Sequence, residues 1–293
     1  MKKAVFFAVL AAALYALNSP LSKLLLRSVP PTMMAGFLYL GAGVGMALTG
    51  LIRRQAGRGT GEARLCRKDL PYTLGMILLD IAAPIFLMIG LKGTTAENAS
   101  LLNNFEIVAT ALIARLFFRE RIGKHLWIAI GLVSLASMLL SVESAECFRF
   151  SAGSLFVLLA CVCWGLENNC TRCLSKSDPL EIVVIKGFCS GLGSVLIGLA
   201  AGESLPGLAE ILKIMLLGFV AYGLSIYFYV YAQRDLGAAK TSAYYAVAPF
   251  IGVVLSLVIF REMPGVLFFI ALVIMGAGTW MINRENKKSG QPE

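Results

Sequence analysis

The sequence predicts an all-α membrane protein with ten transmembrane helices in two inverted five-helix repeats. Three observations lead to this fold class: the composition, the length of the apolar runs and a weak internal repeat. Of the 293 residues, 58% are hydrophobic and 15% are charged, and the mean hydropathy is +0.79. Soluble domains average about 25% charged residues. A protein with so few charges fits a bilayer better than water.

Short connections separate the apolar segments, and each segment has about the length that a membrane-spanning helix needs. Lipid forces the backbone to satisfy its own hydrogen bonds, so runs this long are helices rather than short barrel strands. The first run begins like a secretory signal, but it continues past Asn18 to Leu26, which favours a retained helix. The ten segments cover residues 4–26, 32–52, 70–91, 95–118, 124–141, 151–174, 180–201, 208–232, 238–260 and 264–282.

The net charge of +9 does not indicate a nucleic-acid partner, because the basic residues cluster between apolar runs. The clearest cluster is IRRQAGRGTGEARLCRKD at 52–69. With ten helices, an even number, both termini lie on the same side of the membrane, and lysine and arginine are enriched on that side. This pattern predicts a multi-pass protein of the cytoplasmic (inner) membrane with both termini cytoplasmic. The expected partners are the lipid bilayer and a small-molecule substrate, with the chain a monomer or a homodimer.

The internal repeat consists of two pairs of matching motifs. LYALNSPLSKL (14–24) aligns with CWGLENNCTRC (163–173), and FFRER (117–121) aligns with IFREM (259–263). The repeats are expected at residues 1–142 and 150–285, within one membrane domain. Five helices in each half is an odd number, so the second half lies upside-down relative to the first. Inverted repeats around a midplane site are typical of secondary transporters.

These motifs resemble the drug/metabolite transporter (DMT) superfamily, specifically its EamA-type ten-helix transporters. The resemblance covers the whole chain and rests on LYALNSPLSK, CWGLENNCTR and the glutamates of FFRER and IFREM. It implies that helices 1–4 and 6–9 enclose the site, with helices 5 and 10 peripheral. Family members often carry Glu-Pro in the fourth helix of each repeat. Here the first repeat has Glu106-Ile107 and the second has Ala248-Pro249.

Three acids, Asp80, Glu106 and Glu167, stand out because each lies in the interior of an apolar segment and is flanked by apolar sequence. A carboxylate in the middle of a bilayer costs about 2.5–3.5 kcal/mol on insertion scales, so these side chains are expected to face a cavity or another helix. Polar and aromatic residues at helical spacing accompany them on helices 1, 4, 6 and 9. The simpler alternative is that the polar groups only join helices. The candidate substrate-binding residues are Tyr15, Asn18, Ser19, Asp80, Asn103, Glu106, Trp164, Glu167, Asn168, Tyr244 and Tyr245.

Several roles for these residues stay open. Carboxylates beside aromatic rings suit a small organic cation, an amine or an amino acid. Glu106 or Glu167 is also a candidate for proton coupling, and Glu106 alternatively serves only the fold. Lys23 and Arg172 are candidates for a gate or a counter-charge, or else extend to the membrane interface. Pro20, Pro84 and Pro249 are expected to interrupt their helices.

Missing motifs narrow the function. The sequence has no phosphate-binding loop for ATP and only one histidine, so it fits neither a P-loop pump nor an HExxH protease. No catalytic residue, cofactor or metal site is expected, and the protein is not an enzyme. The sequence therefore predicts a secondary transporter, an exporter or a permease, that moves a small polar metabolite by alternating access. The alternatives are a proton-coupled drug/metabolite antiporter with Glu106 as the proton site, and a membrane protein that does not transport.

Overall fold

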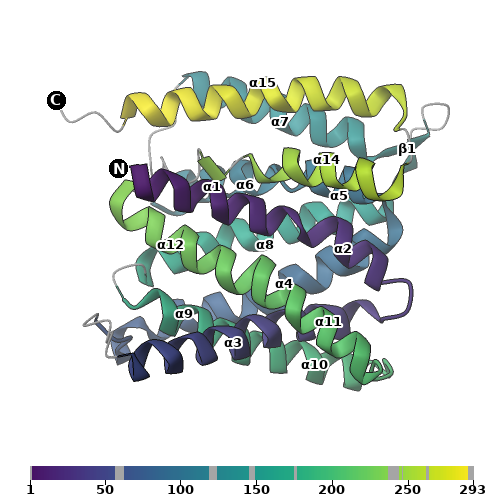
Figure 1. Ribbon diagram of the computed structural model, residues 1–293. Coiled ribbons are helices and arrows are strands. Elements are labelled where there is room, and N and C mark those ends of the chain that lie inside the picture. Colours follow the sequence, from purple (N-terminus) through teal and green to yellow (C-terminus); the bar gives the residue numbers. More distant parts are fainter. Residues whose placement is uncertain are drawn as a thin grey trace.

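The computed structural model describes residues 2–56, 63–118, 124–144, 149–174, 177–236, 244–245, 247–261 and 264–289. These residues form a bundle of helices, shown in Figure 1. The strands in this part of the chain are β1 (Val142–Ser144) and β2 (Arg149–Phe150), which pair antiparallel. Because they are so short, they leave the class unchanged, and the predicted all-helical fold is confirmed.

The apolar segments fold into helices that are continuous in some cases and broken in others. The first half contains α1 (Lys2–Ala16), α2 (Asn18–Leu25), α3 (Pro31–Gln55), a short 3₁₀ turn η1 (Arg67–Asp69), α4 (Leu70–Gly93), α5 (Ala96–Leu102), α6 (Phe105–Phe118) and α7 (Lys124–Ser141). The second half contains α8 (Ala152–Leu174), α9 (Pro179–Ile185), η2 (Lys186–Ser190), α10 (Gly191–Ala200), α11 (Leu208–Gly218), η3 (Phe219–Leu224), α12 (Ser225–Leu236), α14 (Ala248–Phe260) and α15 (Val266–Ser289).

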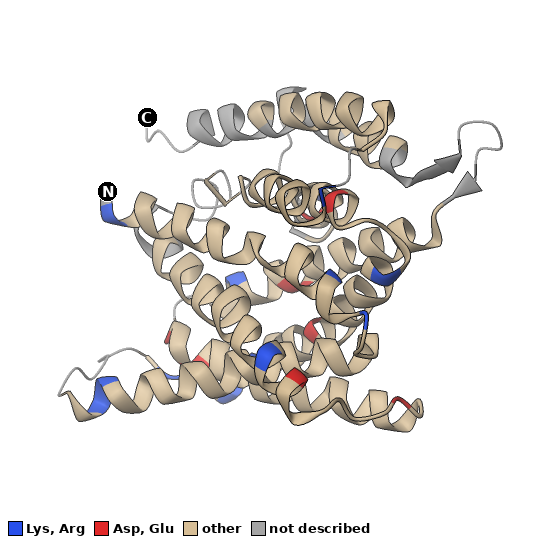
Figure 2. Cartoon of the chain, turned by 45° about the vertical axis from the view of Figure 1, so that its right-hand side comes forward, with Lys and Arg blue, Asp and Glu red and all other residues tan. Residues whose placement is uncertain are grey.

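The described helices have the length and the surface of membrane spans. Large apolar side chains such as Leu78 and Leu196 are each 65% exposed on the outside of the bundle, where a water-soluble protein would carry polar groups. Ala248–Phe260 and Val266–Gly278 are also apolar, but they are shorter than the 18 residues taken as the minimum for a membrane span. Figure 2 shows few charged residues along the helices. Among the residues that the structure describes, seven stretches are long and apolar enough to cross a membrane: Lys3–Leu25, Pro31–Gln55, Arg67–Gly93, Ala96–Phe117, Ala152–Leu174, Pro179–Ala200 and Leu208–Ala232.

Proline has a different effect in each of its three predicted positions. Pro20 lacks an N–H to donate to Ala16 O four residues earlier, and the chain breaks here between α1 and α2. Pro84 lies inside α4, which continues to Gly93, so the predicted interruption there is wrong. Neighbouring helices and local adjustments make such a proline tolerable in a membrane helix. Pro249 occupies the first turn of α14, where its missing N–H leaves no helical bond unmade.

Two segments of the second half are wound as π-helix, η2 and η3. At η2 the backbones touch: a Cβ added to Gly187 would lie 2.2 Å from Gly43 Cα on α3. Glycine is therefore required at this crossing, which brings η2 against the middle of α3. Single-turn π segments inside helices are frequent at functional sites.

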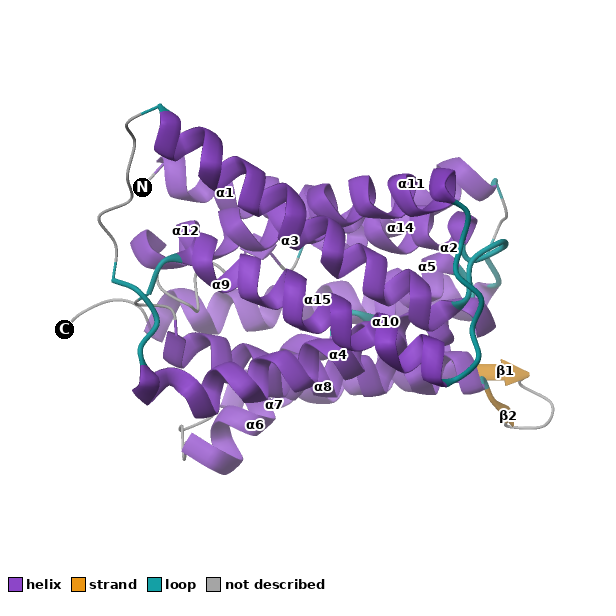
Figure 3. Ribbon diagram, turned by 90° about the horizontal axis from the view of Figure 1, so that it is seen from below, coloured by secondary structure: helices purple, strands orange, loops and turns teal. Residues whose placement is uncertain are grey.

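The main helix contacts join the two halves of the chain. α4 packs on α8 and α1 on α12; α6 packs on α8 and α1 on α14; α3 packs on α10 and α5 on α14. α7 and α15 pack mainly on each other and form a separate layer at one edge in Figure 1. Figure 3 shows the other helices running side by side along the length of the bundle. The core of the protein is thus built between the halves rather than within each one.

Candidate functional site

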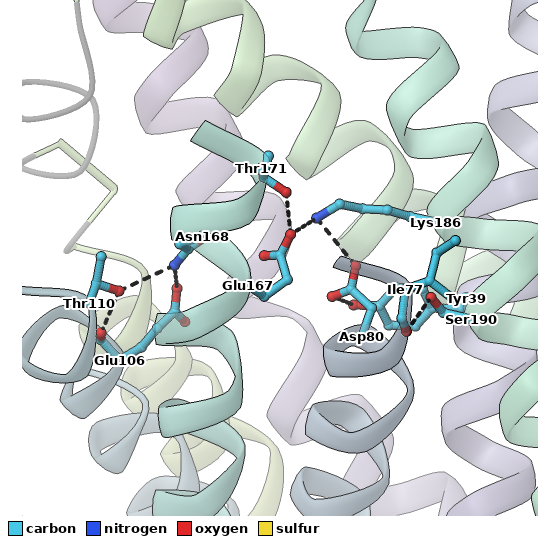
Figure 4. A network of polar contacts seen from close by, with 10 residues as sticks. All are labelled: Tyr39, Ile77, Asp80, Glu106, Thr110, Glu167, Asn168, Thr171, Lys186 and Ser190. Carbon is cyan, nitrogen blue, oxygen red and sulfur yellow. Dashed lines mark hydrogen bonds and ion pairs between the residues drawn. The ribbon is translucent and has the colours of Figure 1, made fainter. Parts of the chain in front are cut away.

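A lysine inside the bundle lies between two carboxylates. Lys186 Nζ is 2.5 Å from Glu167 Oε1 and 3.3 Å from Asp80 Oδ2, and Lys186 and Asp80 are 4% and 1% exposed. Figure 4 shows the three side chains pointing toward one another from η2, α8 and α4. The pair with Asp80 therefore links the second half of the chain to the first, at a buried position where an isolated charge is least tolerable.

Lys186 was not among the residues selected from the sequence. It stands in an apolar run, IVVIKGFCSGLG (182–193), in which it is the one charged residue. A lysine in such a run has no favourable place in lipid, and the chain also contained three acids in need of a partner. That combination was the signal that could have identified Lys186 as part of the site.

The backbone around Lys186 explains why its side chain points inward. Lys186 is the first residue of the π segment η2 and precedes Gly187, whose contact with Gly43 holds the segment against α3. At the other end of η2, Ser190 Oγ donates to Ile77 O of α4 at 3.2 Å. η2 is thus fixed to α3 on one side and to α4, the helix of Asp80, on the other.

Hydroxyl groups complete the surroundings of the two carboxylates. Tyr39 OH donates to Asp80 Oδ1 at 2.8 Å, and Thr171 Oγ1 donates to Glu167 Oε1. Removing one member of such a buried group leaves an uncompensated charge, whereas the intact group contributes little net stability. With both carboxylates ionised, two negative charges face one positive charge, and the three side chains carry a net charge of −1.

Glu106 has neutral partners. Asn168 Nδ2 donates to Glu106 Oε1 at 2.7 Å, and Thr110 Oγ1 donates to the main-chain oxygen of Glu106 at 2.8 Å. Figure 4 shows this group on the side of α8 away from Lys186. Two predicted residues, Glu106 and Asn168, are therefore in direct contact, but they form a second polar group rather than part of the first.

The predicted aromatic residues form a cluster around Tyr15. The ring centroid of Tyr15 lies 6.4 Å from that of Trp164, 5.9 Å from Tyr222 and 5.8 Å from Tyr245. Tyr222 also accepts a hydrogen bond at its OH from Asn18 Nδ2, at 3.0 Å. Four helical segments, α1, α8, η3 and the short stretch before α14, therefore converge on one group of rings.

Tyr222 and Tyr39 were missed by the sequence reasoning. Their rings lie 5.1 Å apart, so Tyr39 connects the aromatic cluster to Asp80. Both stand among other apolar residues, and nothing in the local sequence distinguishes a tyrosine that faces the site from one that fills the core.

The other predicted residues occupy less central places. Ser19 and Asn103 are buried, and Cys161 Sγ approaches Asn103 Oδ1 at 4.0 Å. Tyr244 is half-buried next to Tyr245. The glutamates of the FFRER and IFREM motifs, Glu120 and Glu262, lie outside the described residues.

Lys23 and Arg172, the predicted gate or counter-charge residues, have different surroundings. Lys23 Nζ donates to Leu91 O at 2.5 Å, to Lys92 O at 3.4 Å and to Thr94 O. It thereby satisfies carbonyls at the end of α4, a favourable position for a cation. Arg172 is exposed in the last turn of α8. Their predicted service as a gate or a counter-charge stays a prediction.

These features define a helical membrane protein with charged and aromatic side chains gathered inside its bundle. The model of the EamA-like transporter family matches residues 2–142 and 151–284. The match covers most of the chain, and the chain belongs to this family. The resemblance to EamA-type transporters is thereby confirmed, and the protein is an integral membrane protein.

Curated relatives carry only general names. An uncharacterized transporter of Methanothermobacter thermautotrophicus is 27% identical over 286 residues, covering 92% of this chain and 82% of the relative. The uncharacterized transporter YyaM of Bacillus subtilis is 22% identical over 246 residues, covering 78% and 80%. YdfC of the same organism is 27% identical over 229 residues, covering 75% and 74%. One solved crystal structure covers 99% of this chain and 100% of its own with a TM-score of 0.70. At 18% identity it shows the fold alone.

Proposed function

We propose that this protein is a secondary transporter that moves a small polar metabolite across the cytoplasmic membrane by alternating access. The observation that carries this proposal is the buried group of Asp80, Glu167 and Lys186, contributed by both halves of the chain. Buried charges inside a membrane bundle mark substrate or ion pathways, because they cost free energy that a purely structural bundle avoids. A charged centre between two halves is suited to open alternately to either side.

We further propose ten spans in two inverted repeats, residues 1–142 and 150–285. The contacts of the described helices support this division, because main contacts between the halves have counterparts when the halves are exchanged. The exchange replaces α4 by α11–α12 and α8 by α1–α2, so the α4–α8 contact corresponds to the α12–α1 contact. In the same way the α6–α8 contact corresponds to α14–α1. The two separate family matches, 2–142 and 151–284, agree with the same boundary.

The proposed orientation places both termini in the cytoplasm. The start of α1 and the end of α15 lie on the same side of the bundle in Figure 1, as an even number of spans requires. The excess of lysine and arginine in the connections on that side supports its assignment to the cytoplasm.

The chemistry of the site favours a substrate that carries an amine: an organic cation, a simple amine or an amino acid. Lys186 neutralises one of the two carboxylates, and the second negative charge suits a substrate ammonium group. Tyr39 connects this centre to the rings around Tyr15, and aromatic faces attract cations by about 0.5–2 kcal/mol each. Both forces act on the same part of such a substrate.

Purified protein in sealed vesicles tests this function. Each vesicle sample is loaded with one unlabelled compound: an amine, an amino acid or, as a neutral class, a nucleoside. Counterflow is measured as the uptake of the same compound, labelled, from outside. We expect saturable exchange for at least one amine-bearing compound, and its loss in Glu167→Gln. Glu210→Gln, in the first turn of α11, is the control and keeps the exchange. Folded protein that exchanges none of the compounds contradicts the proposal and favours a membrane protein that does not transport.

A second candidate is a proton-coupled antiporter with Glu106 as the proton site. The observation in its favour is that the described partners of the Glu106 side chain are neutral, whereas Glu167 is paired with Lys186. A carboxyl with neutral partners can bind and release a proton without breaking an ion pair. The effect of a pH gradient on exchange separates this mechanism from transport without protons.

A further inference from the structure

The crossing of α5 and α14 contains polar side chains that the charged centre does not use. Glu97 Oε1, Ser100 Oγ and Ser256 Oγ are buried and have no hydrogen-bond partner among the described residues. The three residues are 4%, 2% and 0% exposed. Buried polar groups in proteins nearly always have partners, and an unpaired one costs about 1–3 kcal/mol. Three such groups at one helix crossing call for a ligand.

These side chains lie on the facing sides of the two helices. Glu97 and Ser100 are three residues apart on α5, and Gly252 and Ser256 are four apart on α14, so each pair shares a helix face. Ser100 Oγ lies only 2.9 Å from the position that a Cβ on Gly252 would take. The two helices run in opposite directions in Figure 1. Glu97 and Ser256 therefore both lie one turn from the Ser100–Gly252 contact, toward the same end of the bundle.

A main-chain oxygen reaches the same place from a third helix. Ala16 O lies 3.4 Å from the Cβ position of Gly252. Pro20 has no N–H, so Ala16 O receives no helical bond from the residue four positions later. The Ala16 carbonyl oxygen and Ser100 Oγ therefore both lie within 3.4 Å of the same position beside Gly252.

The donor set is made of oxygen atoms alone and includes one carboxylate. Oxygen ligands select hard cations. A single carboxylate balances one positive charge, whereas a divalent ion would leave a net charge in the bundle. Among the described residues no group of three or more His, Cys, Asp and Glu could hold a metal ion. Two basic side chains stand on neighbouring elements, but neither is described in contact with Glu97. Lys23 donates to carbonyls at the end of α4, and Arg261, which follows α14, is exposed.

We propose that the α5–α14 crossing is a binding site for a monovalent cation, Na⁺, held by Glu97, Ser100, Ser256 and the carbonyl oxygen of Ala16. Broken helices coordinate ions with freed carbonyls in other transporter folds, and here the break after α1 leaves the Ala16 carbonyl beside the crossing. The site is separate from Lys186. The use of its ion as the driving gradient rests on the proposed transport function, but the binding of the ion does not.

Binding is tested on the full-length protein in detergent, without substrate. Thermal unfolding is followed in NaCl, KCl and choline chloride at equal ionic strength, and ²²Na⁺ binding is measured at equilibrium. We expect Na⁺ alone to raise the Tm saturably. Glu97→Gln loses this increment, and Ser256→Ala raises the half-saturating Na⁺ concentration at least about tenfold, as loss of a ligand should.

Two matched variants serve as controls. Ser194 on α10 is also a fully buried serine without a described partner, and Ser194→Ala keeps the Na⁺ response of the unmodified protein. Gly252→Ala fills the space beside Ser100 and abolishes binding, whereas Gly276→Ala, with no atom within 4 Å of its added Cβ, does not. Equal stabilisation by all three salts, or equal effects of Ser194→Ala and Ser256→Ala, overturns the proposal. Neither result bears on flux of the metabolite, so failure of this site is distinct from failure of the transport function.

Discussion

Lys186 Nζ lies 2.5 Å from Glu167 Oε1, a contact between a π-helical segment and the middle of α8. Asp80 of the first half depends on the same ammonium group, at 3.3 Å. One cation therefore balances acids from both halves of the chain, and substitutions here separate its contribution to stability from its part in transport.

Replacing Lys186 by methionine leaves two buried carboxylates without a cation. We expect Lys186→Met to lower the free energy of unfolding by about 3–5 kcal/mol, the usual effect of breaking a buried ion pair. Denaturant unfolding of the purified protein measures the change. Lys213→Met, at an exposed position of α11, is the control. The double variant Lys186→Met/Glu167→Gln removes one of the stranded charges and should recover part of the loss; no recovery would mean that Lys186 acts independently of Glu167.

Replacing Tyr39 by phenylalanine removes one hydroxyl and preserves the ring. Tyr39 OH donates to Asp80 Oδ1, and hydrogen bonds to charged groups contribute about 1.5–3 kcal/mol. Tyr39→Phe is expected to reduce stability by that amount and to weaken substrate exchange. Tyr72→Phe, at an exposed position near the start of α4, should change neither. Equal behaviour of the two variants would show that the Asp80 contact is not needed.

Adding one methyl group to Gly187 should disturb the site through the backbone. The new Cβ would lie 2.2 Å from Gly43 Cα, and the backbone must separate to admit it. Overpacking of a core costs about 1–3 kcal/mol, and here no side chain can rotate away. We expect Gly187→Ala to lower the Tm and to abolish exchange. Gly131→Ala on α7, with nothing within 4 Å, should be neutral or slightly stabilising in the same measurement.

Glutamine at position 106 tests proton coupling. If Glu106 carries the proton, Glu106→Gln keeps counterflow without a pH gradient and loses the acceleration that a gradient produces. Flux is measured in vesicles with and without the gradient, for this variant and for Glu210→Gln. Loss of counterflow as well would place Glu106 in substrate binding, and an unchanged gradient response would remove it from coupling.

The helices were readable from the sequence because apolar runs of this length have few other structures available in lipid. The buried acids were also predictable, since each stood alone in such a run. The role of Lys186 was not predictable, because it depends on ion pairs with residues 19 and 106 positions away in the chain (186 − 167 and 186 − 80). Proline shows the same limit: Pro20 and Pro84 look alike locally, yet only the first coincides with a break. The outcome is decided by packing against distant helices.

The close approach of Gly43 to Gly187 has a mechanical consequence. Two backbones in direct contact cannot adjust by changing rotamers, so this crossing is a rigid contact one residue away from Lys186. A rearrangement of the bundle that preserves this contact leaves the backbone of Lys186 in place relative to α3 and, through Ser190, relative to α4, so α8 is the element of the centre that is able to move. Lys186 and Asp80 then keep their places, and Glu167 on α8 is the charge that changes position relative to them.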